Sequence, residues 1–168
     1  EGARTATRSI KSYVQLGKLV LVLAGAFLLV ASFAFVLGGG MGLLVLFVRI
    51  SPKVAFQALA KTYIEFFQDT PLLMQFFLIF FGLALFGVDI SPLAAATLGL
   101  TFFTSAYLAE IWRGCVEALP KGQWEASACL AMTRYEQLRY VILPQALRIA
   151  IPPTVGFSVQ VVKGTAVA

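Results

Sequence analysis

Long apolar blocks alternate with short polar stretches along this sequence. One block covers about residues 16–48 with Lys18 as its one charge, and a second covers residues 72–88 with none. A third, residues 93–112, contains only Glu110. Stretches of about 20 apolar residues match the hydrocarbon thickness of a bilayer. The pattern therefore predicts an all-α, polytopic integral membrane protein.

Four helical spans are expected from these blocks, over residues 24–50, 71–88, 92–112 and 149–168. An interfacial or partly inserted segment would precede the first span. The glycines at 38–42 inside that span permit close contact between helices, and a break in the helix is the competing interpretation. All spans belong to one transmembrane domain, residues 1–168.

Local signals refine the boundaries of these helices. Residues 53–68 have apolar side chains at 3–4 spacing and therefore predict an amphipathic helix. Thr70-Pro71 and Ser91-Pro92 each offer an N-cap residue followed by a first-turn proline. The pairs Ala95/Gly99 and Ser105/Ala109 have the small-xxx-small spacing that suits tight packing between membrane helices.

The positive charges orient the molecule. Basic residues cluster in the connection 49–71 and in the polar stretch 113–148, whereas the short turn 87–92 has none. Cytoplasmic loops of membrane proteins carry an excess of Lys and Arg, so the two long connections are expected in the cytoplasm. The N-terminus then lies outside, although residues 1–11 are basic. Either this segment doubles back along the interface, or an upstream part is missing.

Composition agrees with the pattern and excludes other classes. The chain is 60% hydrophobic and only 12% charged, and its net charge of +5 fits cytoplasmic loops better than nucleic-acid binding. It contains no His, and its two cysteines lack the CxxC spacing of a zinc site. No nucleophile–base pair can be assembled from these residues, so neither a catalytic nor a metal site is expected.

The polar stretch 113–148 contains a recognisable local fold. An apolar stripe at helical spacing runs from Trp124 to Ile142, and within it Thr133 and Glu136 have the S/T-x-x-E spacing of a capping box. One helix should therefore end near Ala131 and another begin at Thr133. This helix-turn-helix is either an interfacial connector or a docking element for a soluble partner.

Four segments, in order, give the chain a resemblance to a known family. Glu125-Ala126 with the later Ile142-Leu143-Pro144 resembles the EAA loop of bacterial ABC importer permeases. Three further segments, residues 63–75, 106–113 and 147–153, resemble the polar amino acid permeases of histidine, glutamine, arginine and glutamate uptake systems. Together they cover roughly residues 50–168, most of the chain.

The resemblance implies a type I importer bundle, with a fifth span expected beyond residue 168. It implies a second permease subunit, identical or a sister protein, two cytoplasmic ATPase subunits and an extracytoplasmic solute-binding protein that delivers the amino acid. ATP and Mg would be used by the ATPase subunits, and this chain would bind no cofactor of its own. The chain would lie in the bacterial cytoplasmic (inner) membrane with the EAA loop, residues 113–148, in the cytoplasm.

The sequence departs from the family pattern at three places. The glycine of the EAA loop is Ala131 here, and if that position needs a left-handed backbone, Ala costs about 1–2 kcal/mol. A Lys-Asp-Thr-Ser-Leu pattern appears as residues 163–167 with Gly164 and Ala166 replacing the acid and a hydroxyl. The Arg-Gly usual after Glu-Phe-Phe is Gln68-Asp69. These departures concern coupling strength and ligand polarity and leave the architecture unchanged.

The short helix before Ala131 is expected to dock in a groove of the ATPase. Glu125 would accept a hydrogen bond or pair with an arginine there, and Trp124 would be the apolar anchor, because buried aromatic residues dominate interfaces. Packing of Trp124 against this subunit's own helices is the alternative. The residues assigned to coupling are Gln123, Trp124, Glu125, Ala126, Ala131 and Thr133.

Polar residues at membrane depth are the candidates for the solute path. A zwitterionic substrate needs both an acceptor for its ammonium group and a donor for its carboxylate, which Lys163 with Gln160 would supply. Alternatively, Lys163 reaches toward the interface or pairs with Glu110 or the second subunit. The assigned residues are Lys163, Gln160, Thr104, Ser105, Glu110 and Gln75.

Two functions follow from the sequence. The first is transport of a polar amino acid, as the permease subunit of an ABC importer. The second is a membrane assembly or sensory subunit that retains the permease fold without transporting, which Ala131, Gly164 and Ala166 would favour.

Overall fold

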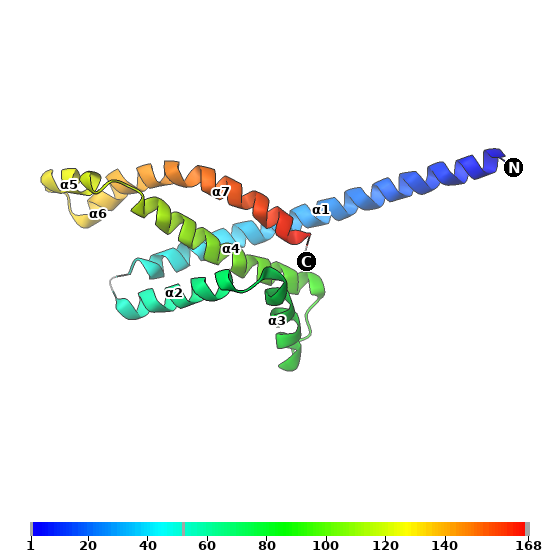
Figure 1. Ribbon diagram of the computed structural model, residues 1–168, viewed down its shortest axis with the longest axis horizontal. Coiled ribbons are helices and arrows are strands. Elements are labelled where there is room, and N and C mark those ends of the chain that lie inside the picture. Colours follow the sequence, from blue (N-terminus) through cyan, green and yellow to red (C-terminus); the bar gives the residue numbers. More distant parts are fainter. Residues whose placement is uncertain (1, 52, 167–168) are drawn as a thin grey trace.

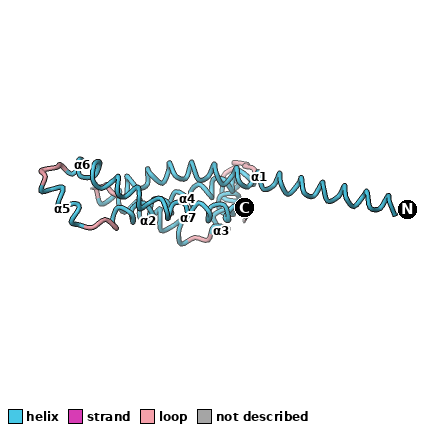
Figure 2. Tube along the Cα trace, turned by 90° about the horizontal axis from the view of Figure 1, so that it is seen from above, coloured by secondary structure: helices cyan, strands magenta, loops and turns pink. Residues whose placement is uncertain are grey.

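The computed structural model describes residues 2–51 and 53–166, with side chains described from residue 15 onward. Every regular element in these ranges is a helix, so the all-α prediction is confirmed (Figures 1 and 2). The elements are α1 (Gly2–Arg49), α2 (Val54–Asp69), α3 (Leu72–Leu85), α4 (Pro92–Glu117), α5 (Lys121–Cys129), α6 (Arg134–Glu136), the π-helix η1 (Gln137–Ile142) and α7 (Leu143–Thr165).

Two helices are long and apolar enough to cross a membrane, at 15–49 within α1 and at 92–117 in α4. Helices α2 and α3 meet the same criteria only as a pair, and they are bent by 106° relative to each other. The predicted amphipathic helix is confirmed as α2. It does not lie apart from the bundle, because it packs against both α1 and α4.

Helix α4 is the centre of the bundle. It packs against α1, α2, α3 and α7, and its buried face contributes Leu100, Phe103 and Leu108 to the main apolar core. Small residues lie between these positions, which lets neighbouring helices approach closely. Burial of this face holds the other helices around α4.

The expected close contact at the first glycine cluster is confirmed, and α1 is unbroken through it. A Cβ atom added at Gly38 would lie 2.7 Å from the Cβ of Thr104, and one added at Gly42 would lie 3.0 Å from the carbonyl of Ser105. Gly99 of α4 makes an equally tight contact with the ring of Phe76 in α3. At these points the absence of a side chain sets the distance between the helices.

Several expected boundaries were wrong. Thr70 does not cap α3, because Pro71 occupies the N-cap position without a side-chain hydrogen bond and Thr70 ends α2. By contrast, the Ser91 hydroxyl does cap α4, accepting a hydrogen bond from the Ala94 N–H at 3.2 Å. Helix α1 runs without a break from Gly2 to Arg49, so the segment expected before the first span continues in the same helix and does not double back.

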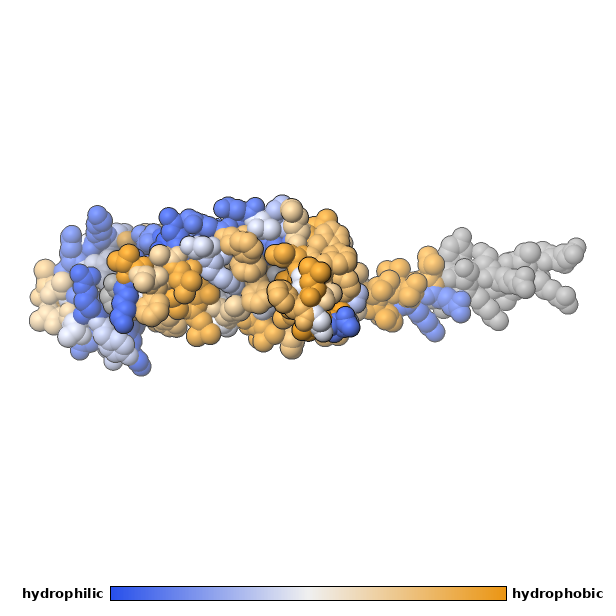
Figure 3. Space-filling model, turned by 90° about the horizontal axis from the view of Figure 1, so that it is seen from below, coloured by the Kyte–Doolittle hydropathy of each residue, from blue (hydrophilic) through white to orange (hydrophobic). Residues whose placement is uncertain are grey.

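Polar and apolar residues separate along the molecule. Helices α5 and α6 lie at the end of the bundle farthest from the N-terminus, together with the connection between α1 and α2 (Figure 1). Hydrophilic residues gather at that end and along one edge of the bundle, whereas hydrophobic residues cover most of the rest of the face shown in Figure 3. The turn between α3 and α4 lies away from the end that carries α5 and α6 (Figure 1). This agrees with the expectation that the two basic connections share one side of the membrane.

Candidate functional site

The segment 118–142 folds as an elbow between α4 and α7, and its turn is a Schellman motif. The N–H of Met132 donates to the carbonyl of Ser127 at 3.4 Å, and the N–H of Ala131 donates to Ala128 at 3.0 Å. Ala131 has a φ of +57°, the left-handed conformation that this motif requires at the residue after the C-cap. The predicted helix end is confirmed, and Ala131 carries the strain that a glycine would not.

The second half of the elbow begins with the predicted capping box. The Thr133 hydroxyl accepts from the N–H of Glu136 at 3.4 Å, and the Glu136 carboxylate accepts from the N–H of Thr133 at 2.8 Å. The Thr133 hydroxyl also donates to the Glu136 carboxylate at 2.8 Å. The two bonds that this carboxylate accepts, first from the Thr133 backbone N–H and then from the hydroxyl, lower the pKa of the Glu136 carboxyl. The turn from α5 to α6 is therefore fixed on both sides.

The elbow has its own small apolar core. Leu119, Ile142 and Ala146 are buried in it, and Trp124 is half-buried against them. The indole of Trp124 thus packs on this subunit's own helices, as the alternative interpretation expected. The π-helix η1 places Ile142 in this core with no exposed surface.

The other residues assigned to coupling lie on the outside of the elbow. Gln123, Glu125, Ala126, Ala131 and Thr133 are all exposed, and the Gln123 side-chain carbonyl accepts from the Gln145 amide at 3.1 Å. Sequence reasoning missed Leu130, which is 76% exposed beside the left-handed turn. The available signal was that Leu130 lies off the apolar stripe of the predicted helix, which passes through 128 and 131 instead.

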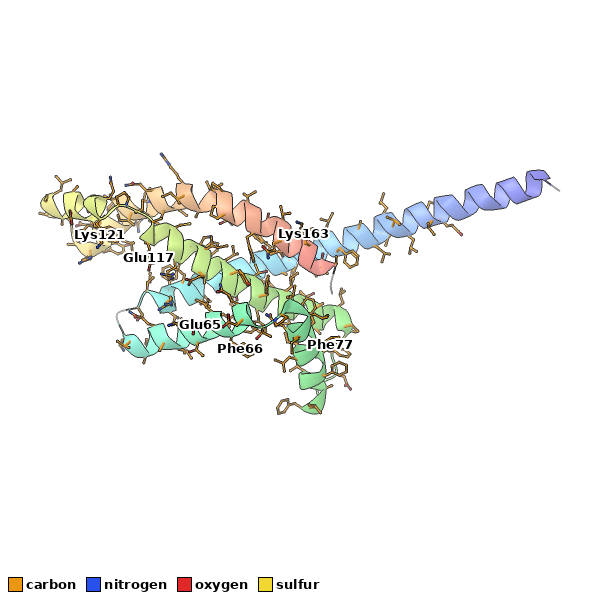
Figure 4. The ribbon with its side chains drawn as sticks, in the orientation of Figure 1. Glu65, Phe66, Phe77, Glu117, Lys121 and Lys163 are labelled. Carbon is orange, nitrogen blue, oxygen red and sulfur yellow. The ribbon has the colours of Figure 1, made fainter. Side chains whose placement is uncertain are left out.

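Lys163 and Gln160, both assigned to the solute path from sequence, line one cavity. They line a space of about 500 Å³ together with Leu72, Phe103 and Gly164. Lys163 lies near the end of α7 (Figure 4), and Leu72 at the start of α3 lines the same cavity. Gly164 makes room there, because a Cβ atom at this position would lie 3.1 Å from the side chains of Leu72 and Leu100.

Thr104 and Ser105 do not join that cavity. Both are fully buried where α4 meets α1 and α2, and Thr104 packs against Gly38. The Ser105 hydroxyl is hydrogen-bonded to the Tyr63 hydroxyl at 2.6 Å, a link between α2 and α4 that sequence reasoning missed. Both candidates therefore hold helices together, and no sequence motif signals the pairing with Tyr63.

Gln75 occupies the bend between α2 and α3. Its side-chain amide donates to the backbone carbonyls of Phe67 and Thr70, at 2.8 Å each, and the residue is 1% exposed. These carbonyls lie at the end of α2, where no further helical turn supplies a donor. Gln75 thus fixes the bend and does not face the Lys163 cavity.

Glu110 belongs to a separate charged group. The Arg113 guanidinium donates to its carboxylate, with the Nε atom 3.0 Å from Oε2, and Arg113 also pairs with Glu117. The predicted alternative of a pair between Glu110 and Lys163 was wrong. Glu110 also lines a cavity of about 180 Å³ with four polar residues of α1 and α2: Arg49, Lys61, Glu65 and Gln68.

Comparison with known proteins assigns this architecture to a family. Residues 34–168 match the family described as "Binding-protein-dependent transport system inner membrane component". The chain is 33% identical over 144 residues to the probable amino-acid ABC transporter permease protein YckA of Bacillus subtilis (strain 168), covering 86% of this chain and 64% of that relative. It is 40% identical over 121 residues to the glutamine transport system permease protein GlnP of Escherichia coli (strain K12), covering 70% and 55%.

Solved structures give the same result for the fold. The crystal structure of an amino acid ABC transporter with histidines superposes with a TM-score of 0.90 at 34% identity, covering 93% of this chain and 73% of that chain. The inward-facing MetNI methionine ABC transporter superposes with a TM-score of 0.60 at 23% identity, covering 86% and 68%, a likeness of fold alone. The chain spans less than two-thirds of the length of both sequence relatives described above.

Proposed function

This chain belongs to the family of binding-protein-dependent transport system inner membrane components, and we propose that it is the permease subunit of an ATP-driven amino acid importer. In this role it forms part of the solute path and pairs with a second permease subunit in the bacterial inner membrane. Two cytoplasmic ATPase subunits, which use ATP and Mg, drive it, and an extracytoplasmic binding protein delivers the solute. The names of the relatives support an amino acid as the solute.

The elbow is the observation that supports this function most directly. Its turn is fixed by the Schellman motif and the capping box, so the exposed face of α5 has a defined orientation. That face presents one carboxylate, Glu125, beside the small side chain of Ala126 and the apolar side chain of Leu130. A short rigid helix with this surface suits docking into a groove of a soluble partner.

The division of roles within the elbow changes with this geometry. Because Trp124 is half-buried in the elbow's own core, its indole packs α5 against that core. The exposed Leu130 is then the apolar anchor, and Glu125 is the charged contact. The ATPase would therefore contact the C-terminal end of α5 and the turn at Ala131.

The cavity with Lys163 is the part of the solute path within this chain. An ammonium group beside an amide suits a carboxylate ligand, and the walls from Leu72, Phe103 and Val159 are apolar. An amino acid carboxylate placed there would pair with Lys163 and accept a hydrogen bond from Gln160. The acceptor for its ammonium group would come from the second subunit.

The coupling function is tested by reversing the charge of Glu125. The Glu125→Lys variant should insert into the membrane and yet lose co-purification with the ATPase, together with ATPase stimulation by the loaded binding protein. Asp89→Lys makes the same change of charge in the exposed turn between α3 and α4, on the other side of the membrane from the elbow, and it should leave co-purification with the ATPase intact. Normal uptake by Glu125→Lys would overturn the assignment of the elbow. If the unaltered chain binds no ATPase in lipid, the importer function itself fails.

A further inference from the structure

An apolar groove runs between α1, α4 and α7 on the half of the bundle nearest the elbow. It has a volume of about 410 Å³, and its walls include Leu43 of α1, Trp112 and Val116 of α4, and Ile151 of α7. Thr154 is its one polar wall residue, and its hydroxyl accepts a hydrogen bond from the Trp112 indole N–H at 3.0 Å. The groove therefore presents no free polar side chain to an occupant.

A second cavity of about 380 Å³ adjoins the groove at Val116, which lines both. This mouth lies between the end of α1 and the elbow, and its charged wall residues are Arg113, Glu117 and Arg134. Arg113 is already paired with Glu110 and Glu117, whereas Arg134 forms no ion pair with any described residue. Arg134 is thus the charged wall residue of the mouth that forms no ion pair with a described residue.

The two cavities together match a phospholipid, because the apolar groove corresponds to an acyl chain and the charged mouth corresponds to a headgroup. The wall residues proceed from Leu43 of α1 in the groove to Ile50, directly after α1, in the mouth, a rise of about 10 Å along the helix axis. Over that distance the lining changes from apolar to cationic, on the side where the elbow leaves the bundle. Basic pockets between transmembrane helices at this level suit anionic lipid headgroups.

We propose that the groove binds one phospholipid with an anionic headgroup, its acyl chain between α1, α4 and α7 and its headgroup beside Arg134. A protein segment would need to supply an apolar ridge and an acidic group at the same spacing, whereas one lipid molecule supplies both. The elbow contributes Trp124 and Leu138 to the same mouth. The lipid therefore contacts the element assigned to ATPase docking, and anionic lipid steadies its attachment to α4.

The two tryptophans of the chain provide the test, because Trp112 lines the groove and Trp124 lines the mouth. The whole chain is reconstituted in phosphatidylcholine vesicles with a small share of brominated phosphatidylglycerol or brominated phosphatidylcholine, and quenching of tryptophan fluorescence is measured. The brominated anionic lipid should quench at about fivefold lower concentration, the preference that one surface charge gives. A Trp124→Phe variant isolates the signal of Trp112.

Matched variants separate a lipid site from general contact with the bilayer. Arg134→Gln should abolish the preference for the anionic lipid, whereas Arg139→Gln, an exposed arginine of η1 that lies outside the mouth, should keep it. Ile151→Phe should reduce quenching of Trp112 by filling the groove, and Ile149→Phe, exposed on α7 outside the groove, should not. Equal quenching by both lipids, or equal loss in both arginine variants, overturns the proposal. Absence of quenching by either lipid also overturns it, because the groove is then covered by protein.

Discussion

Replacement of Ala131 by glycine should stabilise the elbow. Ala131 is held at a φ of +57°, where its Cβ atom is crowded by the following backbone. Removal of the Cβ atom releases about 1–2 kcal/mol of this strain. Glycine also gives the unfolded chain more freedom, which costs about 0.4–1 kcal/mol. With the middle of each range, the difference is a net stabilisation of about 0.8 kcal/mol for the A131G variant.

Hydrogen exchange at the Schellman motif measures this difference directly. The N–H groups of Ala131 and Met132 donate the two hydrogen bonds that close the turn, so they exchange only when the elbow opens. A stabilisation of about 0.8 kcal/mol slows their exchange about two- to fivefold in the A131G protein in lipid nanodiscs.

The control is Ala126→Gly in the middle of α5. Ala126 is exposed and helical, so the same loss of a methyl group relieves no strain there and instead destabilises the helix by about 0.5–1 kcal/mol. The two variants should therefore change exchange in opposite directions. Faster exchange in both would show that the left-handed turn at Ala131 is not strained, and the reasoning would fail.

Three further changes probe the bundle and the elbow. Gly38→Ala should destabilise the bundle by about 1–3 kcal/mol, measured as a lower Tm in detergent, because the new methyl group meets Thr104. Gln75→Leu should destabilise by about 1–3 kcal/mol, because two part-buried carbonyls at the bend lose the donor that the buried Gln75 amide supplies. As pH falls, protonation of Glu136 should open the capping box and speed amide exchange at Thr133, but only below the usual titration range of a glutamate, because its pKa is lowered.

Each of these changes has a matched control. Gly40→Ala adds the same methyl group to open space and should not lower the Tm. Gln160→Leu removes an exposed amide with no hydrogen-bond partner among the described residues, so its Tm should stay near that of the wild type. Glu125→Gln should leave the pH dependence of exchange at Thr133 unchanged, whereas Glu136→Gln should remove it. An acid response that persists in Glu136→Gln would assign it to another group.

The elbow was the part of the site that sequence could predict in detail. A capping box is a local device, because the Thr133 hydroxyl and the Glu136 carboxylate meet three residues apart on the same turn. The end of α5 at Ala131 followed from the same pattern and from the family's glycine. Interactions between residues three or four positions apart can be predicted from the sequence.

The roles of the buried polar residues could not be predicted in this way. The contacts of Ser105 with Tyr63 and of Trp112 with Thr154 join residues about forty positions apart, so they depend on how the helices pack. Gln75 was expected on the solute path because a buried amide in an apolar helix suggests a ligand. Its partners are backbone carbonyls freed by the 106° bend between α2 and α3, and no local pattern reveals such a bend.

The packing of the elbow explains how a displacement of α5 would be transmitted to the cavity lined by Lys163. The elbow core joins Val116 of α4 to Ile142 of η1 and Ala146 of α7, so both long helices are attached to one rigid unit. Close-packed groups of this kind move together and do not compress. Helix α4 contributes Phe103, and α7 contributes Gln160 and Lys163, to the cavity at the far end of the same two helices. A rotation of the elbow would therefore turn both walls of that cavity relative to α3, which contributes Leu72 and is attached to neither end of the elbow.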